Sequence, residues 1–369
     1  MNRLAEINAK HERLRDFMAE KGYSAVLLKK QPNFSWFTAG GLNMVGIATE
    51  MGMTSLLITR DARYCIANRI EAARMMDEEG LAALGFKLLE HEWYVDREAE
   101  LIRQVAGGLE QVAADVSFAA CKNADGELRK LRFSLTENEV ERYLFLGEKL
   151  SAAIEKTALG IRPGDKECEI AGRLGAELWK DRIDPTGIMV AADDRIYKYR
   201  HPIPTSQMVK RYVMVCVNAR YKGLITTVTR MVHFGRPTAK LAQQYLHNNE
   251  IECRMIAATK PGQPAVAAFK AALAAYREFG YADEWQLHHQ GGAMGYYGRD
   301  SKVTEATADL VVENQAYCWN PSISGTKTED GFIATGHGPL FITRPVIFPR
   351  LETTIDGLTL IKPGMLIID

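Results

Sequence analysis

A Pro-Gly junction that occurs twice in this chain constrains the fold more than any other feature. Residues 161–165 read Ile-Arg-Pro-Gly-Asp and residues 259–263 read Thr-Lys-Pro-Gly-Gln, so that Pro163 and Pro261 are 98 residues apart. Each junction separates two predicted helices, and strand-rich sequence follows each helix pair. Although Pro-Gly is common between helices, the matched flanking helices favour an internal duplication. We predict one α+β domain with pseudo-two-fold symmetry and a central cleft between its halves.

The helices around the two junctions are predicted from apolar spacing and end signals. Thr136 and Glu139 have the spacing of a capping box, and Gly160 ends the helix that begins there. Three further helices are predicted at residues 167–179, 240–257 and 265–279.

The region before these helices has the pattern of a separate α/β domain. Apolar spacing predicts helices over residues 3–21, 70–83 and 96–113, and buried strands at Ala25–Leu28 and Thr54–Ile58. The chain has 369 residues, more than the roughly 250–300 that share one core. We therefore predict an α/β domain over residues 1–133 and the duplicated domain over residues 134–369.

Composition excludes several classes of protein. The chain has 46 basic and 46 acidic residues, so it presents no overall field that would attract nucleic acid or an acidic membrane. No apolar run reaches the roughly 18 residues of a membrane span, and no secretory signal is recognised at the N-terminus. The six cysteines form no CxxC pair, which is typical of reduced thiols. We expect a cytoplasmic protein.

One predicted hairpin carries the first resemblance to a known family. It has strands at residues 213–217 and 224–234 joined by a turn at 218–223. The hairpin resembles the first metal-binding hairpin of the creatinase/aminopeptidase P/prolidase family, which reads D-x-G-A-R-Y-x-G-Y-x-x-D-x-T-R. Ala219–Tyr221, Gly223 and Thr229–Arg230 match that pattern in register.

Other segments resemble the same family in the same order along the chain. They are Asn33–Gly40, Tyr199–Pro202, Gly291–Asp300, Trp319–Pro321 and Gly325–Asp330. The resemblance implies an N-terminal creatinase-like α/β domain and a C-terminal pita-bread domain of α+β type. It also leads us to expect a homodimer.

The resemblance implies five metal ligands, and this chain departs from most of them. The family holds two cations with two aspartates, a histidine and two glutamates. The corresponding positions hold Cys216, Thr227, Gly292, Asn320 and Glu329. One carboxylate cannot hold two divalent cations. We therefore predict no metal at this site and no other cofactor.

Two residues are predicted to be catalytic. His201 stands where the family keeps a histidine that helps catalysis, and Glu329 is the retained ligand. We expect both to line one cleft, with His201 as the base that activates water and Glu329 orienting or protonating. A buried Glu329 without a metal needs a cationic partner, and His201, Lys327 and Arg299 are the candidates.

The remaining site residues are predicted to contact substrate. Arg299 stands where the family has its second histidine, and it either clamps a substrate carboxylate or pairs with Asp300 or Glu329. On a strand, only one of His288 and His289 would face the cleft. Gly291–Gly292 is interpreted as a close backbone approach to a ligand. The full predicted set is Arg299, His288, His289, Asn320, Thr227, Cys216 and Lys327.

Three functional hypotheses follow. The first is a metal-independent hydrolase that cleaves an amidine, guanidino or amide C–N bond of a small, polar, carboxylate-bearing substrate. The chain is similar to creatinase at Tyr296–Asp300, although Thr229 replaces a creatinase glutamate. The second is an Xaa-Pro-type aminopeptidase or dipeptidase with an altered metal site, for which Cys216, one of the paired histidines and Glu329 form a possible zinc set. The third is a non-catalytic protein that binds a small molecule.

Overall fold

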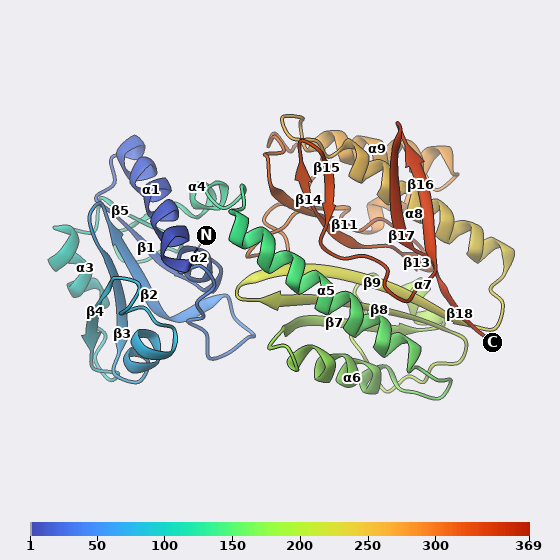
Figure 1. Ribbon diagram of the computed structural model, residues 1–369, viewed down its shortest axis with the longest axis horizontal. Helices are drawn as coiled ribbons and strands as arrows, with labels where there is room; N and C mark the ends of the chain where they lie inside the picture. The colour runs from blue at the N-terminus through green and yellow to red at the C-terminus, as the bar shows by residue number, and fades with distance from the viewer. Residues whose placement is uncertain (1) are drawn as a thin grey trace. The chain divides into compact units, whose positions relative to one another are not determined.

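The computed structural model describes residues 2–369, which divide into two compact units (Figure 1). The first unit contains the chain up to Glu139 together with Lys222–Leu224. The second contains Val140–Tyr221 and Ile225–Asp369. No helix of the described residues is long and apolar enough to cross a membrane.

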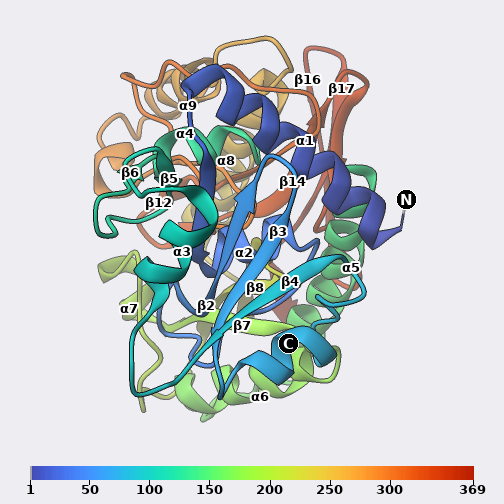
Figure 2. The ribbon, with the colours of Figure 1, turned by 90° about the vertical axis from the view of Figure 1, so that its left-hand side faces the viewer.

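The first unit is built on a six-stranded mixed sheet of order β4-β3-β2-β1-β5-β6, in which β2, β3 and β4 lie side by side (Figure 2). Its strands are β1 (Ala25–Lys30), β2 (Met51–Thr59), β3 (Arg63–Asn68), β4 (Phe86–His91), β5 (Val112–Ala114) and β6 (Lys122–Asn123). Its helices are α1 (Arg3–Lys21), α2 (Gln31–Phe37), the π-helical turn η1 (Arg74–Glu78), α3 (Glu98–Ala106) and α4 (Asp125–Lys130). The sheet confirms the predicted α/β class.

Two predicted helices of this unit are wrong in extent. The segment 70–83 forms only the short turn η1, and the segment 96–113 contains α3 followed by strand β5. Gly107 ends α3 in a left-handed conformation, with φ +77°. Val112–Ala114 is fully buried and pairs in parallel with β1. Pairing with a distant strand therefore overrides the helical spacing that the sequence shows.

The second unit holds two four-stranded sheets, of order β18-β9-β8-β7 and β10-β11-β14-β15. Its helices are α5 (Glu137–Leu159), α6 (Glu167–Trp179), α7 (Asp194–Lys198), α8 (Ala239–Ala258), α9 (Val266–Glu278) and η2 (Glu284–Leu287). The strands of its first half are β7 (Asp184–Ala192), β8 (Tyr212–Tyr221) and β9 (Leu224–Phe234). Those of its second half are β10 (Gly291–Ala293), β11 (Gln315–Trp319), β12 (Ser322–Ile323), β13 (Thr326–Lys327), β14 (Asp330–Thr335), β15 (Gly338–Phe341), β16 (Arg350–Ile355), β17 (Leu358–Pro363) and β18 (Leu366–Ile368).

The duplication is visible in matching backbone hydrogen bonds at the two Pro-Gly junctions. The Gly164 amide donates to the Val209 carbonyl at 2.8 Å, and the Gly262 amide donates to the Val311 carbonyl at 2.8 Å. The return bonds from Val209 and Val311 go to the residue after each glycine, at 2.9 Å in both halves. The junctions therefore occupy equivalent places, as the repeat predicts.

The local signals around α5 and the β8–β9 hairpin are largely confirmed. The Thr136 amide donates to Oε2 of Glu139 at 2.8 Å, and the Glu139 amide donates to Oγ1 of Thr136 at 3.3 Å, which is a complete capping box. The hairpin turn is shorter than predicted. Lys222 and Gly223 both have positive φ, 47° and 86°, as a two-residue turn of type I′ requires.

A fully buried network of charges crosses the core of the second unit. Arg230 donates to Glu155 at 2.9 Å and to Asp330 at 3.1 Å, while Lys362 donates to Asp330 at 2.7 Å and to Glu252 at 2.8 Å. Burial raises the pKa of Glu252 to about 7. The neighbouring Lys362 lowers this pKa, and the negative charge of Asp330 raises it. Because these side chains pair with one another, we assign the network a structural role in holding the strands together and not a role in binding a ligand.

Candidate functional site

Side chains from both halves of the second unit meet around a small cavity of about 210 Å³. Its lining residues are Met189, His201, Asn218, His289, Gly298, Arg299, Asn320, Lys327 and Glu329. The structure therefore brings together His201 and Glu329, the two predicted catalytic residues, as expected. It also places His289, Arg299, Asn320 and Lys327 there.

Three predicted substrate-contacting residues are not part of this lining. Cys216, Thr227 and His288 do not line the cavity. Thr227 instead donates from Oγ1 to Oδ1 of Asn218 at 2.6 Å. Asn218 was missed in the sequence, although a signal was present. It follows Cys216 by two positions on β8, and strand alternation places both on one face.

Glu329 is the electrostatic centre of the cavity, and two cationic side chains hold it. Its Oε1 accepts from Nη2 of Arg299 at 2.8 Å, and its Oε2 lies 3.0 Å from Nζ of Lys327. Thr229 donates to the same Oε2 at 2.9 Å. Burial opposes ionisation, but Lys327 and Arg299 prevail and lower the pKa of Glu329 to about 2. These contacts favour an ionised Glu329, which does not support the predicted role as a proton donor.

Cys216 lies beside this carboxylate as a buried thiol. Its Sγ is 3.4 Å from Oε2 of Glu329 and 3.6 Å from Nζ of Lys327. Burial raises the pKa of Cys216 to about 11. A thiol that stays protonated is a poor nucleophile, because the thiolate is the reactive form.

The residues at the family's ligand positions do not fit a dinuclear cation centre. A Cβ at Gly292 would lie 2.0 Å from the carbonyl oxygen of Ser301, so the backbone leaves no room for a histidine there. Thr227 is bound to Asn218, and both oxygens of Glu329 face cationic groups. Hard divalent cations need several anionic oxygens, whereas this set offers one carboxylate that is already paired.

The two glycines of β10 serve packing rather than ligand contact. A Cβ at Gly291 would lie 2.3 Å from the carbonyl oxygen of Cys318 on the neighbouring strand β11. The glycines have φ of +98° and +154°, which other residues rarely adopt. The expectation of a close approach to a ligand is therefore wrong, because protein backbone fills the space.

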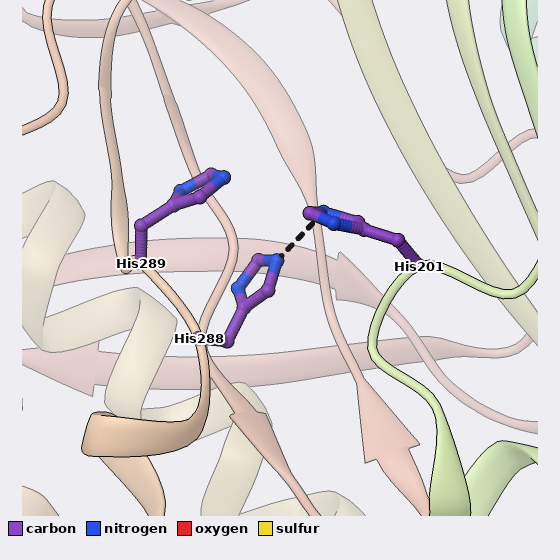
Figure 3. A group of neighbouring side chains, drawn as sticks. All are labelled: His201, His288 and His289. Atoms are coloured by element: carbon purple, nitrogen blue, oxygen red, sulfur yellow. Dashed lines mark hydrogen bonds between the residues drawn. The ribbon is translucent and has the colours of Figure 1, made fainter.

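Three histidines form a cluster at the edge of the cavity (Figure 3). Nε2 of His288 lies 3.0 Å from Nε2 of His201. The rings of His288 and His289 stack, with centroids 4.3 Å apart and planes 27° apart. Of the pair, His289 lines the cavity and His288 does not, in agreement with the prediction that only one faces the cleft. The reason given for it was wrong, because the pair lies between η2 and β10 rather than on a strand, and both rings lie near His201.

Burial and nearby cations keep these imidazoles uncharged. Burial, and then Lys327, lower the pKa of His288 to about 2. Burial and the nearby Arg299 lower the pKa of His289 to about 4. Burial and the nearby Lys327 also lower the pKa of His201. His201 hydrogen-bonds with His288 rather than with Glu329, so the predicted histidine–glutamate couple does not form in this structure.

Two buried polar atoms of the cavity residues have no partner among the described residues. They are Nε of Arg299, a donor, and Oδ1 of Asn320, an acceptor. Buried polar atoms are rarely left unsatisfied, so these two are the natural contacts for water or for a ligand. They sit on residues that the family resemblance identified as site positions.

Comparison with known proteins places the chain in a family. Residues 145–338 match the sequence profile of Metallopeptidase family M24, and residues 10–143 match that of the Creatinase/Prolidase N-terminal domain. An Xaa-Pro dipeptidase from Pyrococcus horikoshii is 23% identical over 92% of this chain and 97% of its own length. An uncharacterized peptidase of Bacillus subtilis, YqhT, is also 23% identical, over 90% of this chain and 97% of its own.

Solved structures share the fold over nearly the whole chain. An Xaa-Pro dipeptidase from Bacillus anthracis superposes with a TM-score of 0.78 at 20% identity, over 98% of this chain and 100% of the other. The N-terminal domain of a FACT complex subunit from chickpea, Cicer arietinum, superposes with a TM-score of 0.70 at 12% identity, over 92% and 97%. The same fold thus occurs in proteins with very different names. The chain belongs to metallopeptidase family M24, with its two-domain pita-bread fold, and hydrolysis is the class of reaction that this membership supports.

Proposed function

We propose that this protein hydrolyses a C–N bond in a small carboxylate-bearing substrate without the dinuclear metal centre of its family. The observation that carries the proposal is the triad of Arg299, Lys327 and Glu329, in which two cations surround the one retained carboxylate. The triad has a net charge of about +1 and faces a cavity of about 210 Å³. Fixed positive charge thus lies where the family keeps its cations.

The triad is suited to an anionic or polarised ligand. Arg299 has a buried Nε without a partner, and Asn320 has an unpartnered Oδ1. A substrate carboxylate or a carbonyl oxygen meets the guanidinium and ammonium groups, while an amide N–H meets Asn320. A preorganised donor stabilises the negative charge that develops on the carbonyl oxygen when the carbon is attacked.

His201 is the proposed base. Its imidazole is uncharged at neutral pH and lines the cavity, so its free nitrogen accepts a proton from a water molecule. The water oxygen bonds to the electrophilic carbon, and the electron pair of the C–N bond leaves with nitrogen. The imidazolium then returns the proton to that nitrogen. Glu329 orients Arg299 and Lys327 and stays ionised throughout.

The relatives suggest the substrates to test first. Proteins named Xaa-Pro dipeptidases share the chain's length and fold, so we propose Xaa-Pro dipeptides beside amidino and guanidino acids. An alternative function is binding of a small carboxylate without turnover. His201 is hydrogen-bonded to His288, and Glu329 is hydrogen-bonded to Arg299. This arrangement favours the alternative, because no hydrogen bond joins His201 to Glu329 as a proton relay would require.

The test is turnover by chelator-treated, full-length protein on that panel, with detection of the released amine. We expect turnover, and His201→Ala should lower it by about 10²–10⁴-fold. His337→Ala is the matched control, because His337 is an exposed histidine at the turn between β14 and β15. Activity that appears only with added Mn²⁺ or Co²⁺ would overturn the proposal of metal independence. Saturable binding without turnover of any substrate would establish the alternative.

A further inference from the structure

We infer that His201, His288 and His289 together bind one borderline transition-metal ion, best represented by Zn²⁺, at a position distinct from the family's ligand set. One ring nitrogen from each residue lies within 4.8 Å of the others. None of the three replaces a ligand of the dinuclear centre that the family resemblance implies. The inference does not rest on the proposed hydrolysis, because it concerns binding alone.

The spacing of the nitrogens comes close to what zinc requires. Tetrahedral zinc with Zn–N bonds of about 2.0–2.1 Å holds its ligand nitrogens roughly 3.3 Å apart. The Nε2 atoms of His201 and His288 are already 3.0 Å apart. A third nitrogen at up to 4.8 Å has to approach by about 1.5 Å, which is within the reach of side-chain rotation.

The stacked rings of His288 and His289 have to move before all three histidines can bind one ion. The near-parallel rings of His288 and His289 do not aim their in-plane lone pairs at one point, so one ring must tilt (Figure 3). His289 is the more mobile candidate, because it is half-buried whereas His288 is largely buried. Its Nδ1 accepts a hydrogen bond from the Gly291 amide at 3.3 Å. This bond is long, so breaking it costs little free energy.

The chemistry of the ligand set selects the metal. Three neutral imidazoles suit zinc, copper or nickel and offer little to magnesium or calcium, which prefer oxygen. Such a set leaves one coordination position open. Lys327 and Arg299 are close enough to act on these rings and oppose a bare dication. The same charges favour an anionic fourth ligand, such as hydroxide or a carboxylate, which lowers the net charge of the bound ion.

A consequence for activity follows because both roles use the His201 ring. When zinc binds Nε2 of a neutral His201, the proton of the ring is on Nδ1, so neither nitrogen can accept a proton from water. Zinc occupancy would therefore inhibit the hydrolysis proposed above, and removal of zinc would relieve the inhibition. The metal site and the proposed base role can thus fail separately: the first is measured by stoichiometry and the second by turnover in the presence of chelator.

The experiment is calorimetric titration of ZnCl₂ into untagged, full-length, chelator-treated protein, since a polyhistidine tag would bind zinc itself. We expect about one zinc per chain. His288→Ala and His201→Ala should each weaken binding at least about 10-fold, because each removes a ligand. The controls are His337→Ala and Cys168→Ser, which remove an exposed imidazole and an exposed thiol and should change nothing.

Cobalt substitution supplies a second readout for variants that fold poorly. Co²⁺ bound to three imidazoles gives visible absorption without a thiolate charge-transfer band. That spectrum in the wild-type protein, together with unchanged circular dichroism in the variants, supports the inference. Either a zinc affinity unchanged in both histidine variants or a thiolate band that disappears in Cys216→Ser would overturn it.

Discussion

Nζ of Lys327 lies 3.0 Å from Oε2 of Glu329, so an ammonium group pairs with the last carboxylate of the family's ligand set. Arg299 occupies the other oxygen at 2.8 Å. Glu329 is 1% exposed, Lys327 is 6% exposed and Arg299 is 13% exposed. A buried triad of this kind is sensitive to the loss of any member.

Glu329→Gln should lower the free energy of unfolding by about 3–5 kcal/mol, because it leaves two buried cations without their anion. Urea denaturation measures the change. Glu250→Gln is the matched control, since Glu250 pairs with Arg254 at 2.6 Å but is 34% exposed, and it should cost about 0–1 kcal/mol. Equal losses in the two variants would contradict the triad as a stabilising unit. Replacing Lys327 by Met in the Glu329→Gln background should recover part of the loss.

Gly292→Ala should destabilise the fold by about 3 kcal/mol, through backbone strain and overpacking. The added Cβ would lie 2.0 Å from the Ser301 carbonyl oxygen, and the residue has φ of +154°. The control is Gly172→Ala on the exposed face of α6, where a Cβ meets nothing within 4 Å. It should stabilise the protein by about 0.5–1 kcal/mol. If Gly292→Ala is as harmless as the control, β10 has more room than the structure shows.

Glu252 should make stability fall as pH rises from about 4.5 to 7. Burial raises its pKa to about 7 in the folded chain, above the ordinary value of 4.5 for a glutamate. Between those values the folded state holds a proton that the unfolded state has lost, so raising the pH favours unfolding. Unfolding free energies of wild type and Glu252→Gln at pH 5, 6, 7 and 8 test this. The difference between the two proteins should change with pH, and a constant difference would exclude titration of Glu252 in this range.

Thiol reagents should distinguish the cysteines by burial. Cys168 is exposed, whereas Cys216 is fully buried with a pKa of about 11. In folded protein, iodoacetamide should label Cys168 first and leave Cys216 unmodified until the chain unfolds, because the thiolate is the reactive form. Peptide mass spectrometry after timed labelling shows the order. Rapid labelling of Cys216 under native conditions would show that the cavity admits reagents to an activated thiol.

Local sequence signals determined much of the fold. The Thr136–Glu139 capping box and the helices 167–179 and 240–257 depend on interactions within one or two turns. Such interactions can be read from neighbouring residues alone. The family motifs were also sufficient to predict that His201 and Glu329 line one cavity.

The partners within the site were decided only by the tertiary structure. Arg299 and Glu329 are 30 residues apart, and Cys216 and Glu329 are 113 apart, so no local pattern says which of several cations meets the carboxylate. The same holds for the stacking of His288 on His289, and for strand β5 in place of the end of a predicted helix. Long-range packing fixes these contacts, because burial energy and charge pairing depend on residues that meet only after the chain has folded.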